Sequence, residues 1–358
     1  MPAIYYHPEA FSISGPRLMG RNAAGESFLR GFLKYSRSKE FWAQVEQPDH
    51  AVDFANKVLN SGRSEQVLSV NKTSLKELSQ AEVLFYPGPD IGKQAFHRTL
   101  HGNGLWSLCG ITHTTSSDRA MDSIVDLITS PIQPWDALIC TSKAVKDNVE
   151  SILQAQIYYL KDRLGIAKFA APELPIIPLG IHTDDFNFNR DEVAESRKSL
   201  GVSENSLVVL YLGRLSFHAK AHPLAMYQAL EKAFHRTNKE VVLIECGWHA
   251  NDEVAKIYKE TAEEFCPNIK LINLDGRKAA NRQMAWASAD IFCSLSDNIQ
   301  ETFGIVPIEA MAAGIPVVVS DWDGYKDTVR DGVDGFRIPT NMPQDGLGKD
   351  LAYRHAIG

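Results

Sequence analysis

The sequence of 358 residues lacks a long apolar run. Its most apolar stretch, residues 305–319, is interrupted by Glu309, two prolines and Gly314, whereas a membrane-spanning helix needs roughly 20 consecutive apolar residues. The first residues, Met-Pro-Ala-Ile-Tyr-Tyr-His, also lack the basic start and the apolar core of a signal peptide. We therefore expect a cytoplasmic protein, for which peripheral contact with a membrane stays open.

Paired cysteines and an excess of basic residues are lacking as well. The five cysteines are scattered without a C-x-x-C pair, which favours buried thiols in a reducing compartment over disulfides. The formal net charge of −7 argues against a general nucleic-acid binder, and no spacing of His, Cys and Asp indicates a zinc site. With 44% hydrophobic and 23% charged residues, the composition is that of an ordinary globular protein.

The chain is longer than one hydrophobic core usually serves, so two domains are expected. Short apolar runs alternate with amphipathic segments, which is typical of an α/β protein with largely parallel sheets. A polar stretch at 178–190 indicates the junction, and we divide the chain into domains at 1–185 and 186–358. The expected strands are 3–6, 83–86, 108–112, 137–140, 207–212, 241–245, 269–274, 291–294 and 317–320. The expected helices are 25–37, 74–79, 120–128, 143–161, 223–236, 253–265 and 277–288.

Two glutamates eight positions apart, Glu301 and Glu309, flank a glycine turn and the start of a short helix. Pro307 fits the first helical turn, and Gly314 with Pro316 can end the helix. In a continuous helix the two carboxylates would lie roughly 12 Å apart, too far for the separation of about 5 Å that a retaining glycosidase uses. The pair is better suited to binding a polyol at two places, because carboxylates accept hydrogen bonds from hydroxyl groups. By itself, the spacing also fits any α/β protein.

A second polar segment follows the expected strand at 207–212. It reads Gly213-Arg-Leu-Ser-Phe-His-Ala-Lys220, so Arg214 and Lys220 are two cations six residues apart at a strand end. A planar guanidinium and a compact ammonium together suit a diphosphate. On this segment alone, two solvated surface cations are an equally good interpretation.

The string that runs from Glu301 to Gly335 resembles the E-x7-E signature of family-4 retaining glycosyltransferases, and Arg214 and Lys220 match that family's G-R and K elements. Residues 176–186 are similar to the family's interdomain segment. The resemblance implies a GT-B fold, in which two Rossmann-like domains face a central cleft. It also implies that the N-terminal domain binds the acceptor and the C-terminal domain binds a nucleotide-sugar donor.

The same resemblance implies how the donor is bound. Arg214 and Lys220 would hold the diphosphate and stabilise the negative charge that grows on it as the glycosidic bond breaks. Glu309 would accept the ribose hydroxyls of the nucleotide. Glu301, beside the backbone N–H groups of Phe303 and Gly304, would hold the transferred sugar.

Three further residues follow expected strands. His113 resembles the histidine that the family places near the reaction centre, so it joins Glu301, Arg214 and Lys220 as an implied catalytic residue. Gly247 marks a strand-end turn that allows close backbone approach. Arg277 lies where such enzymes usually meet the nucleobase.

The chain departs from the family's pattern at both ends. The opening loop lacks the usual adjacent glycine pair, and Gly20, Arg21 and Asn22 are its candidate acceptor contacts, although a simple turn and helix start also explain it. At the other end the sequence stops 23 residues after Gly335. The second domain is therefore expected to lack the helices that usually complete it.

The leading hypothesis is a retaining, hexosyl-type glycosyltransferase of polysaccharide or other glycoconjugate assembly. It would move a sugar from a UDP-, GDP- or ADP-sugar to a hydroxyl acceptor such as a glycan or a lipid-linked sugar. The resemblance implies neither a metal nor a cofactor, and no nucleic-acid partner is expected. Two alternatives stay open, namely a nucleotide-sugar epimerase on the same fold and an inactive module that binds nucleotide sugars. The sequence does not identify the base, the sugar, the acceptor, the linkage or the oligomeric state.

Overall fold

Two parallel six-stranded sheets form the framework of the protein. The structure is a computed structural model that describes residues 1–13, 19–115, 117–217, 219–298 and 301–341. The first sheet has the order β3-β2-β1-β4-β5-β6 and the second β12-β11-β10-β7-β8-β9, the doubly wound order of dinucleotide-binding folds. The strands of the first sheet are β1 (Pro2–Tyr6), β2 (Glu40–Val45), β3 (Gln66–Val70), β4 (Val83–Phe85), β5 (Ser107–Ile111) and β6 (Ala137–Ile139). Those of the second are β7 (Leu207–Leu215), β8 (Val241–His249), β9 (Lys270–Asp275), β10 (Ile291–Ser294), β11 (Val317–Ser320) and β12 (Gly335–Ile338).

Helices cover both faces of each sheet. Those of the first half are α1 (Gly20–Tyr35), α2 (Pro48–Asn60), α3 (Ile91–Thr99), α4 (Asp118–Val125) and α5 (Lys143–Leu164). Those of the second half are α6 (Arg190–Ser199), α7 (Leu224–Thr237), α8 (Asp252–Phe265), α9 (Ala279–Ser288), α10 (Ile305–Ala312) and α11 (Tyr325–Thr328). In the first half, α1 and α2 pack on one face, and α3, α4 and α5 pack on the other.

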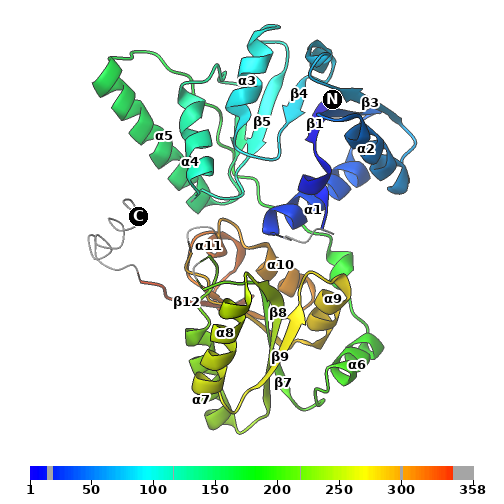
Figure 1. The fold of residues 1–358 in the computed structure, drawn as a ribbon, viewed down its shortest axis with the longest axis vertical. Helices are drawn as coiled ribbons and strands as arrows, with labels where there is room; N and C mark the ends of the chain where they lie inside the picture. The colour runs from blue at the N-terminus through cyan, green and yellow to red at the C-terminus, as the bar shows by residue number, and fades with distance from the viewer. Residues whose placement is uncertain (14–18, 116, 218, 299–300, 342–358) are drawn as a thin grey trace.

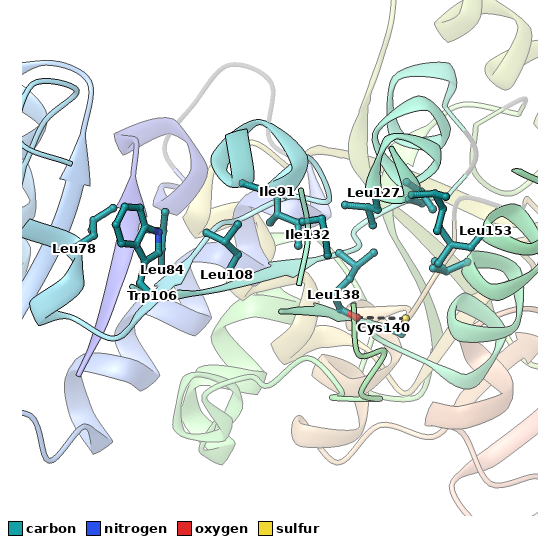
Figure 2. Close-up of a cluster of buried hydrophobic side chains, with 14 of the residues drawn as sticks. Leu78, Leu84, Ile91, Trp106, Leu108, Leu127, Ile132, Leu138, Cys140 and Leu153 are labelled. Atoms are coloured by element: carbon teal, nitrogen blue, oxygen red, sulfur yellow. Dashed lines mark hydrogen bonds between the residues drawn. The ribbon is translucent and has the colours of Figure 1, made fainter. Parts of the chain in front are cut away.

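Apolar side chains form a separate core on each face of each sheet, because strands covered on both sides bury every residue. Figure 2 shows one of these clusters, in which Trp106 lies next to Leu84 at one end and Leu153 of α5 lies at the other, with Leu108 and Leu138 between them. All five cysteines are free thiols, and four of them are buried. They pack as small apolar residues, as the sequence indicates.

The predicted α/β fold of two facing Rossmann-like domains is confirmed, and every predicted strand overlaps an observed one. The predicted helix at 74–79 is a 3-10 helix at Leu75–Gln80. The structure adds elements that the sequence analysis did not assign: strands β2, β3 and β12, and helices α2, α3, α6 and α11. The expected acceptor loop falls in part on residues 14–18, and the expected short C-terminus on 342–358, both outside the described residues.

The two sheets lie one above the other in Figure 1, with α1, α10 and α11 between them. Two hydrogen bonds at Thr302 join the halves: the Ser142 hydroxyl donates to the Thr302 carbonyl oxygen at 2.7 Å, and the Thr302 hydroxyl donates to the His113 carbonyl oxygen at 3.1 Å. The backbone N–H of Lys143, at the start of α5, also donates to the Asp327 carboxylate on α11. These contacts hold the loop before α10 against the first sheet.

An apolar contact between α1 and α10 supports the same arrangement. Ala24 of α1 is buried together with Phe303 and Ile305, and Leu179 and Ile181 pack against them. Within the part of the chain that the structure describes, no helix is long and apolar enough to cross a membrane.

A buried ion pair in the first half gives a test of this packing. Arg98 and Asp136 are both fully buried and form two hydrogen bonds of 2.7 Å, and Asp136 also accepts from the backbone N–H groups of Leu108 and Gln133. Replacing Arg98 by Met leaves an unpaired buried carboxylate, so we expect the free energy of unfolding to fall by roughly 3–5 kcal/mol. Urea denaturation followed by circular dichroism measures this loss.

The matched control is Arg330→Met, which breaks a surface pair between Arg330 and Asp334 in which the arginine side chain is 74% exposed. We expect little change in that variant, because water screens the pair. Equal losses in the two variants would contradict the prediction.

Candidate active site

A cavity of about 580 Å³ lies between the two halves of the chain, within the range of small-molecule sites. All of the predicted site residues line it except Asn22 and Arg277. The first half contributes Gly20, Arg21 and His113. The second half contributes Arg214, Lys220, Gly247, Glu301, Phe303, Gly304 and Glu309. Residues more than 200 positions apart in the sequence therefore line one cavity.

The carboxyl ends of β7, β8 and β9 form one wall of the cavity, in which the glycines Gly213, Gly247 and Gly276 expose their backbone. Gly213 and Gly247 are partners in the β7–β8 ladder, and a Cβ atom on Gly247 would lie 2.0 Å from the Gly213 carbonyl oxygen. A Cβ atom on Gly276, just after β9, would lie 3.0 Å from the Gly247 Cα atom. Any side chain at Gly247 would therefore push the strands apart, and its absence leaves the backbone open to a ligand.

The two predicted cations enter the cavity from the end of β7 and the loop after it. The Arg214 carbonyl oxygen accepts a hydrogen bond from the Tyr211 hydroxyl at 3.0 Å, which fixes the end of the strand. The Lys220 N–H donates to the Ser216 carbonyl oxygen at 3.0 Å, and its ammonium Nζ lies 2.6 Å from Glu301 Oε2. A guanidinium and an ammonium thus line the same cavity as a carboxylate.

The turn that carries Glu301 is fixed by two glycines. Gly304, the N-cap of α10, has φ +78°, and a Cβ atom there would lie 2.2 Å from the Tyr325 ring. A Cβ atom on Gly324 would lie 2.4 Å from the Phe303 backbone, and the Gly324 N–H donates to the Glu301 carbonyl oxygen at 3.1 Å. The chain therefore turns into α10 at one position, with the first N–H groups of the helix beside the cavity.

Glu309 projects from α10 into the cavity. Burial raises the pKa of its carboxyl to about 8, and Arg282 opposes part of the shift. Arg282 itself donates to the Gly276 carbonyl oxygen at 2.8 Å. At neutral pH the Glu309 carboxyl therefore holds a proton, so it can donate one hydrogen bond to a ligand and accept others.

His113 follows β5 on the opposite wall. Burial lowers the pKa of its imidazole to about 4, and the Arg21 guanidinium adds to the shift. The ring is therefore neutral at pH 7, with one nitrogen able to donate and the other able to accept. In the described residues, no group of His, Cys, Asp and Glu side chains could hold a metal ion.

Two predicted residues do not line the cavity. The Arg277 guanidinium is bound by Asp275, with Nε 2.9 Å from Oδ1, and points to this local partner. Asn22 is 5% exposed, and its side-chain amide donates to the Glu9 carbonyl oxygen at 2.8 Å. The cavity is lined instead by Gly276 and Arg282, which share the strand-end region with Arg277.

Several aromatic residues of the cavity were not predicted. Trp248, Phe186 and Trp286 line it, and the Phe186 and Trp286 rings meet edge to face with centroids 6.0 Å apart. Trp248 directly follows the predicted Gly247, so the strand-end argument could have found it. The other two lack such a signal, because Phe186 comes from the interdomain segment and Trp286 from the last turn of α9.

Comparison with known proteins finds a matching protein family for the second half of the chain. Residues 192–352 match the family model described as glycosyl transferases group 1. An uncharacterized glycosyltransferase of Methanocaldococcus jannaschii is 28% identical over 222 residues, which are 60% of this chain and 50% of that protein. The phosphatidyl-myo-inositol mannosyltransferase of Mycobacterium tuberculosis is 31% identical over 169 residues, 47% of this chain and 40% of that protein. The chain thus spans half or less of the length of these curated relatives.

Solved structures resemble the whole chain in fold. The crystal structure of Anabaena HepE in complex with UDP has a TM-score of 0.63 at 13% identity, with 99% of this chain and 89% of that chain covered. A glycosyltransferase structure from Rickettsia africae has a TM-score of 0.63 at 14% identity, with 99% and 88% covered. At these identities the likeness shows the fold, which is the GT-B fold predicted from the sequence.

The raised pKa of Glu309 predicts a pH dependence of stability. The folded protein keeps a proton that the unfolded chain, with an ordinary pKa of 4.5, releases. The resulting stabilisation is fully present below about pH 4.5 and is lost as the pH rises through about 8. Relative to Glu309→Gln, the wild type should therefore lose free energy of unfolding between about pH 5 and about pH 9. Urea titrations across this range measure the difference.

The control is Glu263→Gln, which changes a glutamate whose side chain is 66% exposed on α8. The same pH trend in the two variants would show that burial of Glu309 does not cause it, and would contradict the prediction.

Proposed function

Residues 192–352 belong to the glycosyl transferases group 1 family, and from this premise we propose that the chain is a retaining glycosyltransferase. It moves a hexose-type sugar from a nucleotide-diphosphate donor to a hydroxyl acceptor. In this proposal residues 1–185 form the acceptor domain and residues 186–358 the donor domain, with the reaction in the cytoplasm. The relative named phosphatidyl-myo-inositol mannosyltransferase supports a hexose as the transferred group and a polyol as the acceptor class.

The observation that carries the proposal is the convergence of two cations and two carboxyls on one cavity. Arg214 and Lys220 come from the end of β7 and its loop, and Glu301 and Glu309 come from the entrance and body of α10. A nucleotide sugar carries a diphosphate between two hydroxyl-bearing rings. The cations suit the diphosphate, and the carboxyls suit the ribose and the sugar on either side of it.

The chemistry assigned to these residues is leaving-group stabilisation. The bond between the sugar carbon and the diphosphate oxygen breaks, and the electron pair stays on the diphosphate, whose charge Arg214 and Lys220 offset. The acceptor oxygen forms the new bond on the same face of the sugar, and its proton passes to the departing phosphate. Glu301 is held by Lys220, so it is placed to bind hydroxyls and not to attack the sugar carbon.

The acceptor side of the cavity is assigned to the first half of the chain. Gly20 and Arg21 at the start of α1 line it, together with His113. A neutral His113 can accept a hydrogen bond from an acceptor or sugar hydroxyl at pH 7. Arg21 adds a positive charge at this end, which favours an acceptor with anionic groups.

An epimerase is the weaker alternative. It needs an acid and a base on the two faces of the sugar ring and has no use for an acceptor region, whereas the cavity extends to Gly20 and Arg21 of the first half. An inactive binding module remains an outcome of the test, because it would bind the donor without consuming it.

The donor assignment predicts selective stabilisation by one nucleotide. A thermal-shift screen of UDP, GDP, ADP and their sugar conjugates should show a rise in melting temperature for one base, since a ligand of the native state stabilises it by mass action. The HepE structure with UDP-glucose makes UDP the first candidate. Glu309→Ala should raise the Kd of that nucleotide roughly 10-fold, because ribose contacts are lost. No shift with any nucleotide would overturn the donor assignment.

Turnover gives the second test. Lys220→Ala should lower kcat for sugar transfer by roughly 10²–10³-fold, because the charge on the leaving diphosphate loses a partner. Product is measured by chromatography after incubation of the donor with polyol and glycan acceptors. Lys259→Ala, which removes an exposed lysine of α8, is the matched control and should keep the wild-type rate. Equal rates in all three proteins would show that Lys220 does not act on the leaving group.

A further inference from the structure

Lys220 and Glu301 are bound to each other in the cavity. Lys220 Nζ lies 2.6 Å from Glu301 Oε2, and the two side chains are 28% and 12% exposed. They come from positions 81 residues apart, one in the loop after β7 and one before α10. The pair is a tertiary contact at the centre of the site and is partly withdrawn from water, so breaking it costs more than breaking a surface pair.

The backbone of Glu301 is held by two hydrogen bonds. Its carbonyl oxygen accepts from the Gly324 N–H at 3.1 Å, and its N–H donates to the Asn298 carbonyl oxygen at 3.0 Å. Lys220 lies in a loop and reaches Glu301 through a four-carbon side chain, so it can swing to another partner.

A second carboxyl lies near Glu301. Asp323 has φ +43°, in the left-handed region that a non-glycine residue enters only under strain. Burial, followed by the Glu301 carboxylate, raises the pKa of Asp323 to about 7. Glu301 is thus close enough to act on Asp323, although burial is the larger cause of the shift. Lys220, 2.6 Å from Glu301, is the cation that pairs with the Glu301 carboxylate.

When a donor binds, its diphosphate and the Glu301 carboxylate therefore compete for one cation, Lys220. The diphosphate attracts Lys220 away from Glu301, which then faces both the diphosphate and Asp323 without a counter-charge. A nucleoside diphosphate offers Glu301 nothing in return. A nucleotide sugar offers sugar hydroxyls, which can donate to the released carboxylate.

We propose that the Lys220–Glu301 pair is a specificity-determining latch that opens more readily for a nucleotide sugar than for the nucleoside diphosphate alone. This inference rests on the proposed function of the cavity as the donor site. After transfer, the diphosphate remains without the sugar, and Glu301 takes Lys220 back. The pair thus favours loading of the substrate and release of the product at the same site.

The test compares two affinities in a double-mutant cycle. Calorimetry gives the Kd of the nucleoside diphosphate and of its sugar conjugate for the wild type, Glu301→Gln, Lys220→Gln and the double variant. Glu301→Gln frees Lys220, so the nucleoside diphosphate should bind roughly 5-fold tighter or more. The sugar conjugate should bind no tighter, because its hydroxyls lose an ionised acceptor.

The Lys220→Gln background separates the latch from simple charge repulsion. If Glu301 acts through Lys220, the gain in diphosphate affinity disappears when Lys220 is absent. A gain that persists in that background would mean that Glu301 only repels the diphosphate, and the latch would be refuted. Unchanged or weaker diphosphate binding by Glu301→Gln would refute it as well.

Two further variants keep the result interpretable. Glu301→Asp retains the charge but shortens the side chain, and it should give a smaller gain of the same sign even if Glu301→Gln does not fold. Glu309→Gln, which has no such lysine partner among the described residues, should weaken both ligands alike. Wild-type protein that binds no nucleotide overturns the proposed function itself, whereas wild-type protein that transfers sugar without this pattern overturns the latch alone.

Discussion

Thr302 is hydrogen-bonded twice to the first half of the chain, through its carbonyl oxygen to Ser142 and through its hydroxyl to the His113 backbone. The carboxylate of Glu301 is one position before it, and the buried ring of Phe303 one position after it. The hydrogen bonds of Thr302 therefore fix the distance between the two walls of the cavity, and Thr302 is adjacent in sequence to two residues that line it. Separating the sheets would break both hydrogen bonds and move Glu301 away from the His113 wall.

The surroundings of three ionisable groups in the cavity affect their charges in different ways. Glu301 forms an ion pair with Lys220, whose ammonium nitrogen lies 2.6 Å from the Glu301 carboxylate. Glu309 faces only the more distant influence of Arg282, and burial keeps it protonated at neutral pH. His113 loses its charge through burial next to Arg21. The site thus combines the neutral His113 and Glu309 with the Lys220–Glu301 ion pair and with the further cations Arg21 and Arg214, an arrangement that fits a ligand with both hydroxyl and anionic groups.

The sequence was sufficient for the residues that strand ends and tight turns position. The family resemblance implied that Arg214, Gly247 and Glu301 contact one donor, and they line one cavity, where the parallel strands bring their carboxyl ends to one edge. The sequence did not allow the directions of the side chains to be predicted. Arg277 is bound by the nearby Asp275, whereas Arg282, five positions later on α9, lines the cavity. Strand β2 was missed because buried Gln44 interrupts its apolar pattern, and β12 because this short edge strand exposes its phenylalanine.

The wall of the cavity that the second half contributes, which we propose binds the donor, has a tightly packed backbone. On the donor wall, a Cβ atom at Gly247, Gly304 or Gly324 would overlap neighbouring atoms, so few substitutions are tolerated there. The wall from the first half, which we propose binds the acceptor, is constrained only in part: Gly20 has open space around it, whereas a Cβ atom on Gly25 of the same helix would lie 2.1 Å from the Ala10 carbonyl oxygen. A side chain can therefore be added at Gly20 without disturbing the core. The contacts proposed for the acceptor can vary there more than the contacts proposed for the donor at Gly247, Gly304 and Gly324.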